Sequence, residues 1–514
     1  MSKVLVILHA KVRTLGLRPH SVQRLSAGLP ALHFFPTSKL SYIYLNLLMK
    51  HIFLTSLMTF ITCVIHSQTY IAHVNVVDVV NLKTETDETV VIAGGKIVNV
   101  VKSSSIHIPE KATVIEGTGK YLIPGLVDAH VHFFQSGGLY TRPDVIDLRK
   151  YKPYDKEIGW THAHMEDFLR RYLAAGITTV IDPGSTINFL MQRDTFKNKT
   201  YAPDIYMTGP LLTTYEPDAY KGLGHEEPFY FMQTEEDARK HVDEELQYKP
   251  DFIKIWYITG NNVDSSARAS SHLVKAVIDE AHKHNLKVAV HATEKITAQL
   301  AVEDGADYLV HSVDDTTIDD QFVQLLKEHH VVLCPTLVVL DDYVKTFAQQ
   351  YQSTEADRAL ANPVTLKSIS ELNDIPDTAF VHRVKQRGAV ALKRTATTDS
   401  VMAVNLMKLV NAGVTIATGT DAGNIGTQHA SSFFTEIQLM KQSGMTVPEI
   451  LQSSTINGAK ALGKEDLFGS IEKGKLANMV LLDANPLESL DNWRQINLVI
   501  NKGNAMKPSD ILRQ

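Results

Sequence analysis

Cysteine is scarce in this sequence. The 514 residues include only Cys63 and Cys334, which excludes the disulfide framework that stabilises small secreted domains. A chain of this length can bury a large apolar core and does not need such cross-links. The sequence also lacks a dinucleotide-type glycine fingerprint, an internal repeat and a low-complexity segment. We therefore expect a large globular protein that is stabilised by its core.

The sequence has no surplus of positive charge either. Its formal net charge is -6, hydrophobic residues make up 44% and charged residues 21%, which is ordinary for a soluble globular protein. Because no basic stripe appears, nucleic acid is not expected as a partner. We expect a small-molecule substrate and leave a homo-oligomer open.

Acidic residues are missing from residues 1–77, which contain seven Lys or Arg. Such an asymmetry usually marks a targeting segment. Within it, Met49-Lys50-His51 precedes an apolar run at 52–65 and then His66-Ser67-Gln68. This is the order of a signal peptide, and the run is short for a membrane span. We interpret residues 49–68 as a signal peptide that follows an internal start, and residues 1–48 as a non-native upstream extension.

This interpretation predicts a mature protein that begins near Gln68 or Thr69. It would be exported, periplasmic or secreted, with no stable membrane association after cleavage. Three alternatives remain open. Residues 1–48 could be a mitochondrial presequence, Cys63 could carry the lipid of a lipoprotein, or the apolar run could be an uncleaved membrane anchor.

Short apolar segments alternate with helical patterns after residue 124, which predicts repeated β-α units and a parallel sheet. Eight such units favour a (β/α)8 TIM barrel over residues 125–465, with a doubly wound open sheet as the alternative. A long helix-forming connection at about 340–400 is expected over the barrel mouth. The eight candidate strands are Val127–Phe133, Thr178–Asp182, Ile205–Gly209, Phe252–Tyr257, Lys287–His291, Tyr308–His311, Val331–Pro335 and Thr415–Gly419.

Both ends of the chain have the alternating pattern of antiparallel strands. Apolar and polar residues alternate from Ile71 to Val101 around a Gly94-Gly95 turn, and short strands return after residue 465. We therefore predict a small composite β-sandwich domain from residues 69–124 and 466–514. The predicted fold class is α/β, a TIM barrel with this second domain.

Titratable residues gather at the carboxyl ends of the predicted strands, where barrel enzymes place their active sites. His130 and His132 close the first strand, and residues two apart in a strand face the same side. His291 and His311 end two further strands, and Asp421 follows the last one. Imidazole and carboxylate are the ligands of Zn²⁺ and similar ions. These five residues are therefore candidate metal ligands.

The stretch from Ile123 to His132, Ile-Pro-Gly-Leu-Val-Asp-Ala-His-Val-His, resembles the opening of the amidohydrolase superfamily barrel. Ser454–Ala459 with Leu462-Gly463 resembles the final helix of that family, and Gly469–Asn478 resembles its return strand. The resemblance covers about residues 70–503. Within the superfamily the chain is most similar to the imidazolonepropionase-like and prolidase-like branch, and Pro335-Thr336-Leu337 is typical of that group.

The resemblance also implies a role for Lys254. In prolidase-like members a lysine at this place on the fourth strand is carbamylated and bridges two metals. His130, His132 and Asp421 would then hold the first ion, and His291 and His311 the second. An unmodified Lys254 would imply one ion per chain. One or two divalent ions are therefore expected.

The sequence departs from the family in two places. Asn478 stands where Asp is usual, and the run His291-Ala292-Thr293-Glu294 lacks the second polar or aromatic residue that often follows the strand-five histidine. Substrate contacts therefore do not carry over. The loop Tyr220–His225 resembles the Gly-Gly-His loop of the branch, which implies that His225 polarises the substrate carbonyl.

These observations predict a metal-dependent hydrolase of an amide-type C–N bond in a dipeptide, an N-acyl amino acid or a cyclic amide. Asp421 would take the proton of the attacking water and pass it to the leaving nitrogen. A heterocycle deaminase or an imidazolonepropionase-like cyclic-amide hydrolase is the enzymatic alternative. An exported metal-binding protein without activity is the alternative of another class.

Overall fold

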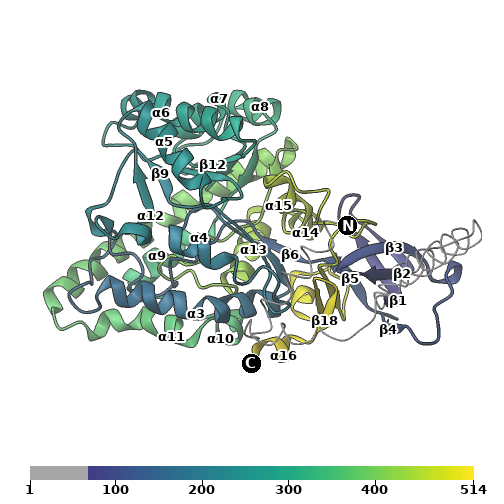
Figure 1. Ribbon diagram of the computed structural model, residues 1–514. Helices are drawn as coiled ribbons and strands as arrows, with labels where there is room; N and C mark the ends of the chain where they lie inside the picture. Colours follow the sequence, from purple (N-terminus) through teal and green to yellow (C-terminus); the bar gives the residue numbers. More distant parts are fainter. Residues whose placement is uncertain (1–67, 514) are drawn as a thin grey trace, which may run out of the picture. The chain divides into compact units, whose positions relative to one another are not determined.

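The structure is a computed structural model that describes residues 68–513, an α/β arrangement with parallel sheets (Figure 1). The predicted upstream extension and nearly all of the predicted signal peptide lie outside the described residues. The strands are β1(Thr69–Asp78), β2(Lys83–Ala93), β3(Lys96–Lys102), β4(Thr113–Glu116), β5(Tyr121–Pro124), β6(Leu126–Asp128), β7(Ile177–Asp182), β8(Asp204–Met207), β9(Leu211–Thr213), β10(Phe229–Phe231), β11(Ile253–Trp256), β12(Val288–His291), β13(Tyr308–Val310), β14(Val332–Cys334), β15(Thr415–Ile416), β16(Met479–Leu482), β17(Ile496–Asn501) and β18(Asn504–Met506). The α-helices are α3(Tyr154–Ala174), α4(Ile187–Arg193), α5(Glu235–Leu246), α6(Val263–Lys283), α7(Lys295–Glu303), α8(Asp320–Glu328), α9(Val338–Phe347), α10(Glu355–Leu360), α11(Pro363–Ser368), α12(Thr378–Asn411), α13(Ser432–Ser443), α14(Val447–Ser453), α15(Ile456–Ala461) and α16(Pro508–Leu512).

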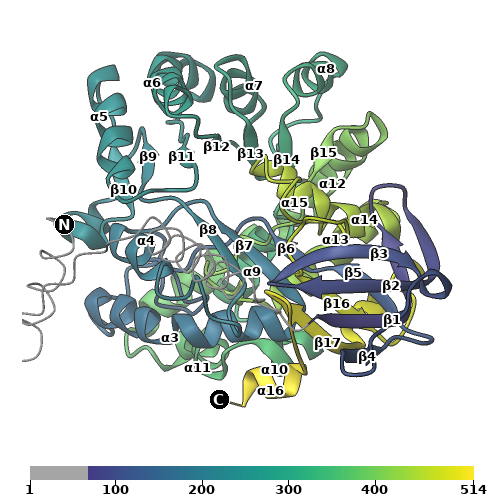
Figure 2. The same cartoon turned by 45° about the vertical axis from the view of Figure 1, so that its right-hand side comes forward.

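The two ends of the described chain share one mixed sheet. Its order is β18-β17-β16-β5-β1-β2-β3, with β4 paired to β1. Figure 2 shows the N-terminal strands β1–β3 beside the C-terminal strands β16 and β17. Gly94 and Gly95 have φ values of 58° and 75° in the turn between β2 and β3, which is the backbone that a tight hairpin turn requires. Ile71, Leu122 and Met479 belong to the apolar cluster of this sheet.

The predicted parallel strands are all present, which confirms the expected α/β class. They lie in a three-stranded sheet, β6-β7-β8, and a seven-stranded sheet, β10-β9-β11-β12-β13-β14-β15. Strands β9 and β10 are additions that the sequence did not predict. Backbone hydrogen bonds connect both edges of the three-stranded sheet to the seven-stranded sheet. At the β8 edge Asp251 N donates to Met207 O at 2.9 Å, and at the β6 edge Ala129 N donates to Thr418 O at 2.9 Å.

Amphipathic helices follow the parallel strands. In α6, the side chain of Asn262 caps the first turn, Lys283 lies in the last turn, and Leu273, Val274 and Val277 are buried. The cap satisfies backbone N–H groups at the start of the helix, and the lysine interacts favourably with the dipole at its end. The buried residues cover apolar surface next to the strands. Helices α5, α6, α7 and α8 stand side by side outside the strands in Figure 2.

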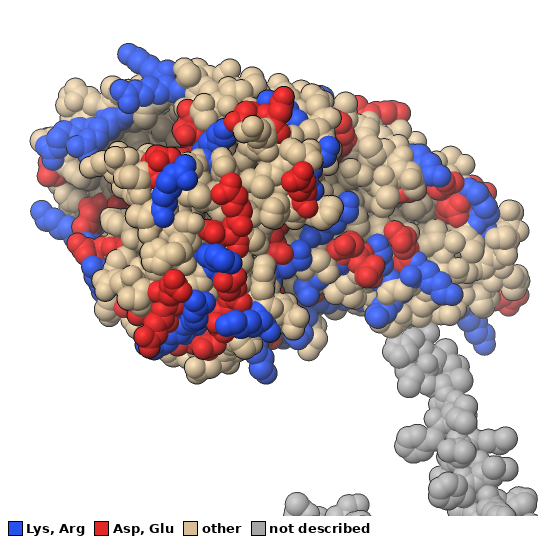
Figure 3. Space-filling model, turned by 90° about the horizontal axis from the view of Figure 1, so that it is seen from above, with Lys and Arg blue, Asp and Glu red and all other residues tan. Residues whose placement is uncertain are grey.

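The connection between β14 and β15 contains helices α9 to α12, as the sequence predicts for this segment. The longest is α12, and α9 and α12 pack closely enough that a Cβ at Gly388 of α12 would lie 2.4 Å from Ala348 N. Among residues 68–513, no helix is both long and apolar enough to cross a membrane. Figure 3 shows positive and negative side chains distributed over the face that it draws.

Candidate metal centre and active site

The register of the parallel strands brings the predicted ligands to one edge. His291 pairs with Trp256 on one side and with Val310 on the other, so that His311 follows at the same level. The rings of His291 and His311 have centroids 4.4 Å apart. Lys254 precedes Trp256 by two positions on β11 and is 1% exposed. The Lys254 side chain therefore reaches this edge from the interior.

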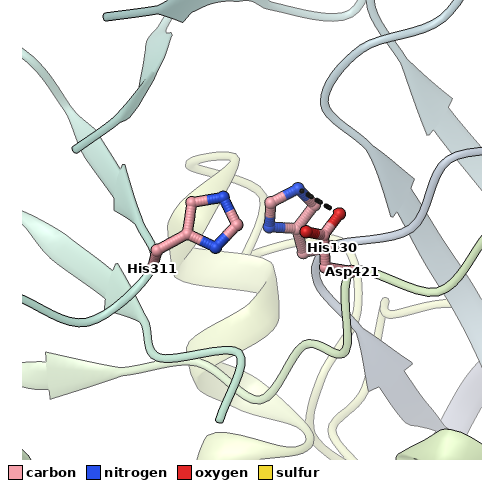
Figure 4. A group of neighbouring side chains, drawn as sticks. All are labelled: His130, His311 and Asp421. Atoms are coloured by element: carbon pink, nitrogen blue, oxygen red, sulfur yellow. Dashed lines mark ion pairs between the residues drawn. The ribbon is translucent and has the colours of Figure 1, made fainter. Parts of the chain in front are cut away.

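His130, His132 and Asp421 form the tightest part of the cluster. His130 Nε2 lies 3.2 Å from His132 Nε2 and 3.4 Å from Asp421 Oδ1. His132 Nε2 lies 3.1 Å from the same Oδ1. His311, which follows β13, faces His130, which follows β6, and their ring centroids are 4.9 Å apart (Figure 4). His130, His311 and Asp421 also form a group whose donor atoms all lie within 4.8 Å of one another.

This geometry fits a metal ion. Four ligands about 2.0–2.1 Å from a tetrahedral Zn²⁺ are roughly 3.3 Å from one another, close to the separations of the His130, His132 and Asp421 atoms. The buried Asp421 Oδ1 has no hydrogen-bond partner among the described residues. A buried carboxylate oxygen without a partner is costly unless a cation is bound to it. The donor set therefore suits a divalent ion such as Zn²⁺.

Neighbouring groups hold the ligand side chains in place. His132 Nδ1 contacts Gly184 O at 2.6 Å and Asp182 Oδ1 at 3.4 Å. His311 Nδ1 contacts Thr336 Oγ1 at 2.6 Å. Such contacts fix the ring orientation and leave the other nitrogen for a metal. Asp182 and Thr336 were not identified as site residues from the sequence, although both stand at ends of predicted strands.

Asp128 positions the Asp421 loop from the first strand. Its carboxylate accepts hydrogen bonds from Thr420 N at 3.1 Å and from Thr420 Oγ1 at 2.9 Å. The Asp421 backbone N–H donates to His130 O at 2.7 Å. The sequence predicted His130 and His132 on the first strand, but β6 ends at Asp128 and both lie in the segment that follows it. Direct bonds thus fix this segment to the Asp421 loop.

Strained backbone occurs at and beside these ligands. His311, Thr336 and Asp421 have φ values of 79°, 46° and 59°. Residues other than glycine seldom adopt this left-handed region, and proteins keep such strain mainly where function requires it. All three residues stand at or just after the ends of neighbouring strands β13, β14 and β15.

Burial and charge set the protonation states of the cluster. Burial lowers the pKa of His130, His291 and His311 well below its usual value, and the nearby Lys254 lowers it further. These rings are therefore neutral and available as ligands. Burial also lowers the pKa of His132, but the adjacent carboxylates of Asp182 and Asp421 outweigh that effect and raise the pKa to about 9. In the metal-free site a proton on His132 compensates the carboxylates, and a metal must displace it.

Two other groups have shifted pKa values. Burial raises the pKa of Asp421, but the ion pair with the neighbouring His132 outweighs it and leaves the pKa below its usual value. Asp421 is therefore ionised at neutral pH. Burial lowers the pKa of Lys254 to about 7, so a substantial fraction of this amine is neutral and nucleophilic.

The cluster forms one end of a cavity of about 580 Å³, a volume usual for a small-molecule site. Its lining includes all six predicted ligands, His130, His132, Lys254, His291, His311 and Asp421. The apolar side chains of Phe134, Phe229 and Trp256 also line it. Residues of α9 and α12, among them Val339, Phe347 and Val384, line it as well. The structure thus brings all six predicted metal ligands to one cavity.

Arg142 is a cavity residue that the sequence analysis did not identify. Its guanidinium donates to Asp144 Oδ1 at 2.8 Å and Oδ2 at 2.6 Å, to Asn424 Oδ1 at 2.6 Å and to Tyr343 OH at 3.2 Å. Asn424 Nδ2 in turn donates to Asp421 O at 3.1 Å. Arg142 therefore links α9 to the Asp421 loop, and no motif in the sequence signals this link.

His225 is not brought to the cluster. It lies on the 3-10 helix η5(Gly224–Glu226), is exposed and is absent from the cavity lining, and its ring stands 5.8 Å from that of Tyr248. The neighbouring Glu226 contacts His162, Asn188 and Thr186, and these contacts hold the loop elsewhere. The predicted role of His225 in polarising a carbonyl receives no support from this position.

Comparison with known proteins identifies the family. The model of the amidohydrolase family matches residues 121–506. The chain belongs to this family. An imidazolonepropionase of Shouchella clausii is 26% identical over 421 residues, which cover 76% of each chain. The resemblance to the amidohydrolase superfamily is therefore confirmed.

Solved structures support the same fold. A Xaa-Pro dipeptidase with bound methionine in its active site has a TM-score of 0.63 and 24% identity, covering 86% of this chain and 100% of that one. The ochratoxinase of A. niger has a TM-score of 0.62 and 19% identity, covering 86% and 96%. These likenesses imply the TIM-barrel fold. Together with the family and the His/Asp cluster, they make this chain a metal-dependent hydrolase of amide-type bonds.

Proposed function

We propose that this protein hydrolyses the C–N bond of a small-molecule amide at the cluster of His130, His132 and Asp421. The observation that carries the proposal is the close approach of three ligand atoms, His130 Nε2, His132 Nε2 and Asp421 Oδ1, which lie 3.1–3.4 Å from one another. We further propose that the eight predicted strands close into a barrel and that the sheet of the two chain ends is the small β-sandwich. The hydrogen bonds that connect the two parallel sheets at both ends support a closed barrel.

The residues of the cluster have distinct roles. A divalent ion, with Zn²⁺ as the first choice, would be held by His130, His132 and Asp421, with His311 and His291 opposite, and would supply Lewis acidity that polarises a carbonyl and acidifies a water. Ionised Asp421 would take the proton of the attacking water and deliver it to the leaving nitrogen. Asp182 and Asp128 would keep His132 and the Asp421 loop oriented while the proton moves.

Lys254 would carry a carbamate in this proposal. Burial favours the neutral form of its amine. This amine would form an N–C bond to CO₂ and release one proton. The product would be an anionic oxygen donor that could serve as a ligand for two ions. Removal of bicarbonate at lowered pH should release CO₂ and one metal per chain. Intact mass spectrometry showing an unmodified lysine in protein that holds a single ion would contradict the bridge.

The test of the function is a substrate panel with Zn²⁺ and bicarbonate present. It should include N-acyl amino acids, dipeptides with and without proline, and cyclic amides, because the relatives comprise an imidazolonepropionase and a Xaa-Pro dipeptidase. Turnover of an amide that is lost with a chelator and restored by metal would support the proposal. Ammonia release from heterocycles alone would point to a deaminase. Metal content without turnover of any compound would contradict the enzymatic function.

We also propose export through cleavage of the signal peptide at 49–68. The support is the order of Lys50, the apolar run and Ser67-Gln68, followed at Thr69 by the first strand β1. N-terminal sequencing of the protein from its native host should find a mature chain that starts within a few residues of Gln68. A chain that begins at Met1 and is recovered from the cytosol would contradict both the internal start and the export.

A further inference from the structure

Helices α9 and α12 present an apolar surface to the cavity, opposite the metal cluster. The lining residues of α9 include Val339, Leu340 and Phe347, and those of α12 include Val384, Ala391 and Met402. We refer to these six residues as the lid wall. All but Met402 are only partly buried, so part of their apolar surface faces the cavity. Apolar surface left against water is unfavourable and favours a ligand that covers it.

Arg142 also lines this cavity, but its positive charge is not available to bind an anionic group of a substrate. The Arg142 guanidinium already forms a two-point ion pair with Asp144, at 2.8 and 2.6 Å, and donates to Asn424 and Tyr343. Its charge is therefore compensated and its donors are largely used. Arg387 of α12 also lines the cavity, but its side chain is exposed to solvent. Apart from Arg142, the buried ionisable side chains of the lining belong to the cluster, where the amide must lie.

We propose that the lid wall binds a bulky apolar group of the substrate, so that the enzyme prefers amides with a long alkyl or aryl substituent over small polar amides. This inference rests on the proposed function, since it assigns the substrate class of the same site. The cavity of about 580 Å³ has room for such a group beyond the amide. Each methylene that leaves water for an apolar wall should strengthen binding about fourfold.

The test measures binding without relying on turnover. Straight-chain alkyl hydroxamates with two, four, six and eight carbons chelate a divalent ion and differ only in the apolar tail. Titration calorimetry on the Zn²⁺-loaded protein should show affinity that rises about 15-fold for every two carbons until the wall is covered. Equal binding across the series, or no binding at any length, would overturn the proposal.

A matched pair of variants on one helix localises the effect. Val384→Ser alters the lid wall, whereas Val390→Ser alters a valine of α12 that is 52% exposed and does not line the cavity. Val384→Ser should flatten the dependence on tail length, and Val390→Ser should leave it as in the wild type. Leu340→Ser on α9 provides an independent second variant if Val384→Ser fails to fold. Indistinguishable slopes for wall and control variants would contradict the assignment.

The two proposals fail in different ways. Binding that grows with tail length, without hydrolysis of any amide in the panel, would refute the hydrolytic function and leave the lid wall intact. Hydrolysis of short polar amides with no gain from longer tails would refute the lid wall and leave the hydrolytic function intact.

Discussion

The cavity has two walls that differ in origin and chemistry. One wall consists of strand ends and carries His130, His311 and Asp421, with ionisable groups, mutual hydrogen bonds and strained backbone. The other consists of α9 and α12 from a single insertion between β14 and β15, is mainly apolar and has regular helical backbone. The first wall is assembled from many parts of the chain, and the second from one. Under the proposed function, the first wall would perform the reaction and the second would select the substrate.

Asp421→Asn should have the largest effect, because it breaks the chemistry of the strand-end wall alone. The amide keeps the size of the side chain but loses the negative charge and the ability to carry the proton. Turnover should fall by about 10²–10⁴-fold, while the melting temperature and hydroxamate tail dependence stay close to wild type. Steady-state kinetics on the best amide of the panel measures the loss. Asp320→Asn on α8, at a side chain that is 95% exposed, is the matched control, and unchanged turnover in Asp421→Asn would contradict the role.

Gly388→Ala should disturb the lid wall and leave the strand-end wall intact. The added methyl group would meet Ala348 N at 2.4 Å and the carbonyl carbon of Phe347 at 2.7 Å, which forces α12 away from α9. The expected cost is about 1–3 kcal/mol of unfolding free energy, together with weaker gain from longer hydroxamate tails. Urea denaturation measures the first effect and calorimetry the second.

Gly159→Ala provides the control for that substitution. Gly159 is also inside a helix, α3, but a Cβ there would meet nothing within 4 Å. The same change should therefore be neutral or stabilise by about 0.5–1 kcal/mol. Equal effects of the two substitutions would show that α9 and α12 are not closely packed.

Glu436→Gln tests the contact between α13 and the start of α9, the helix that carries half of the lid wall. Glu436 of α13 accepts a hydrogen bond from Val338 N at the start of α9, at 2.9 Å, and burial raises its pKa to about 8 from 4.5. Between these pH values the folded protein keeps a proton that the unfolded protein has lost, so stability must fall as pH rises. The neutral glutamine removes this dependence.

The expected difference between wild type and Glu436→Gln is about 3 kcal/mol between pH 5 and pH 8. Unfolding free energies at these two pH values measure it. Glu303→Gln on the exposed face of α7 should retain the dependence of the wild type. A Glu436→Gln variant that loses stability with rising pH as steeply as the wild type would show that Glu436 is ionised in the folded protein.

The strand-end wall could be predicted from the sequence because its signals are local. Alternation of apolar strands and helices located the eight parallel strands, and the metal-type residues at their ends located the predicted ligands. The position of His225 could not be predicted in the same way. Its loop is held by contacts of Glu226 with Asn188 and Thr186, which depend on tertiary structure. The link from Arg142 to Asn424 joins residues 282 positions apart and leaves no local pattern.

The structure also explains one departure from the family. Asn478 Nδ2 donates to Asp204 Oδ2 at 2.7 Å, and its Oδ1 accepts from Lys502 N at 2.8 Å. An amide can donate and accept at once, whereas an ionised Asp could not donate to Asp204. The unusual residue therefore has a partner on β8 that sequence comparison at this single position does not reveal.

The bond between Thr420 and Asp128 spans 292 residues, and this separation affects how the protein is made. Synthesis delivers the four histidines and Lys254 before Asp421, so a nascent chain cannot form the complete cluster until Asp421 has been made. An ion captured early would be held by histidines without the carboxylate and would exchange freely. If the proposed site binds an ion, stable metal retention should follow completed folding, and a chain truncated before residue 421 should fail to retain metal during dialysis.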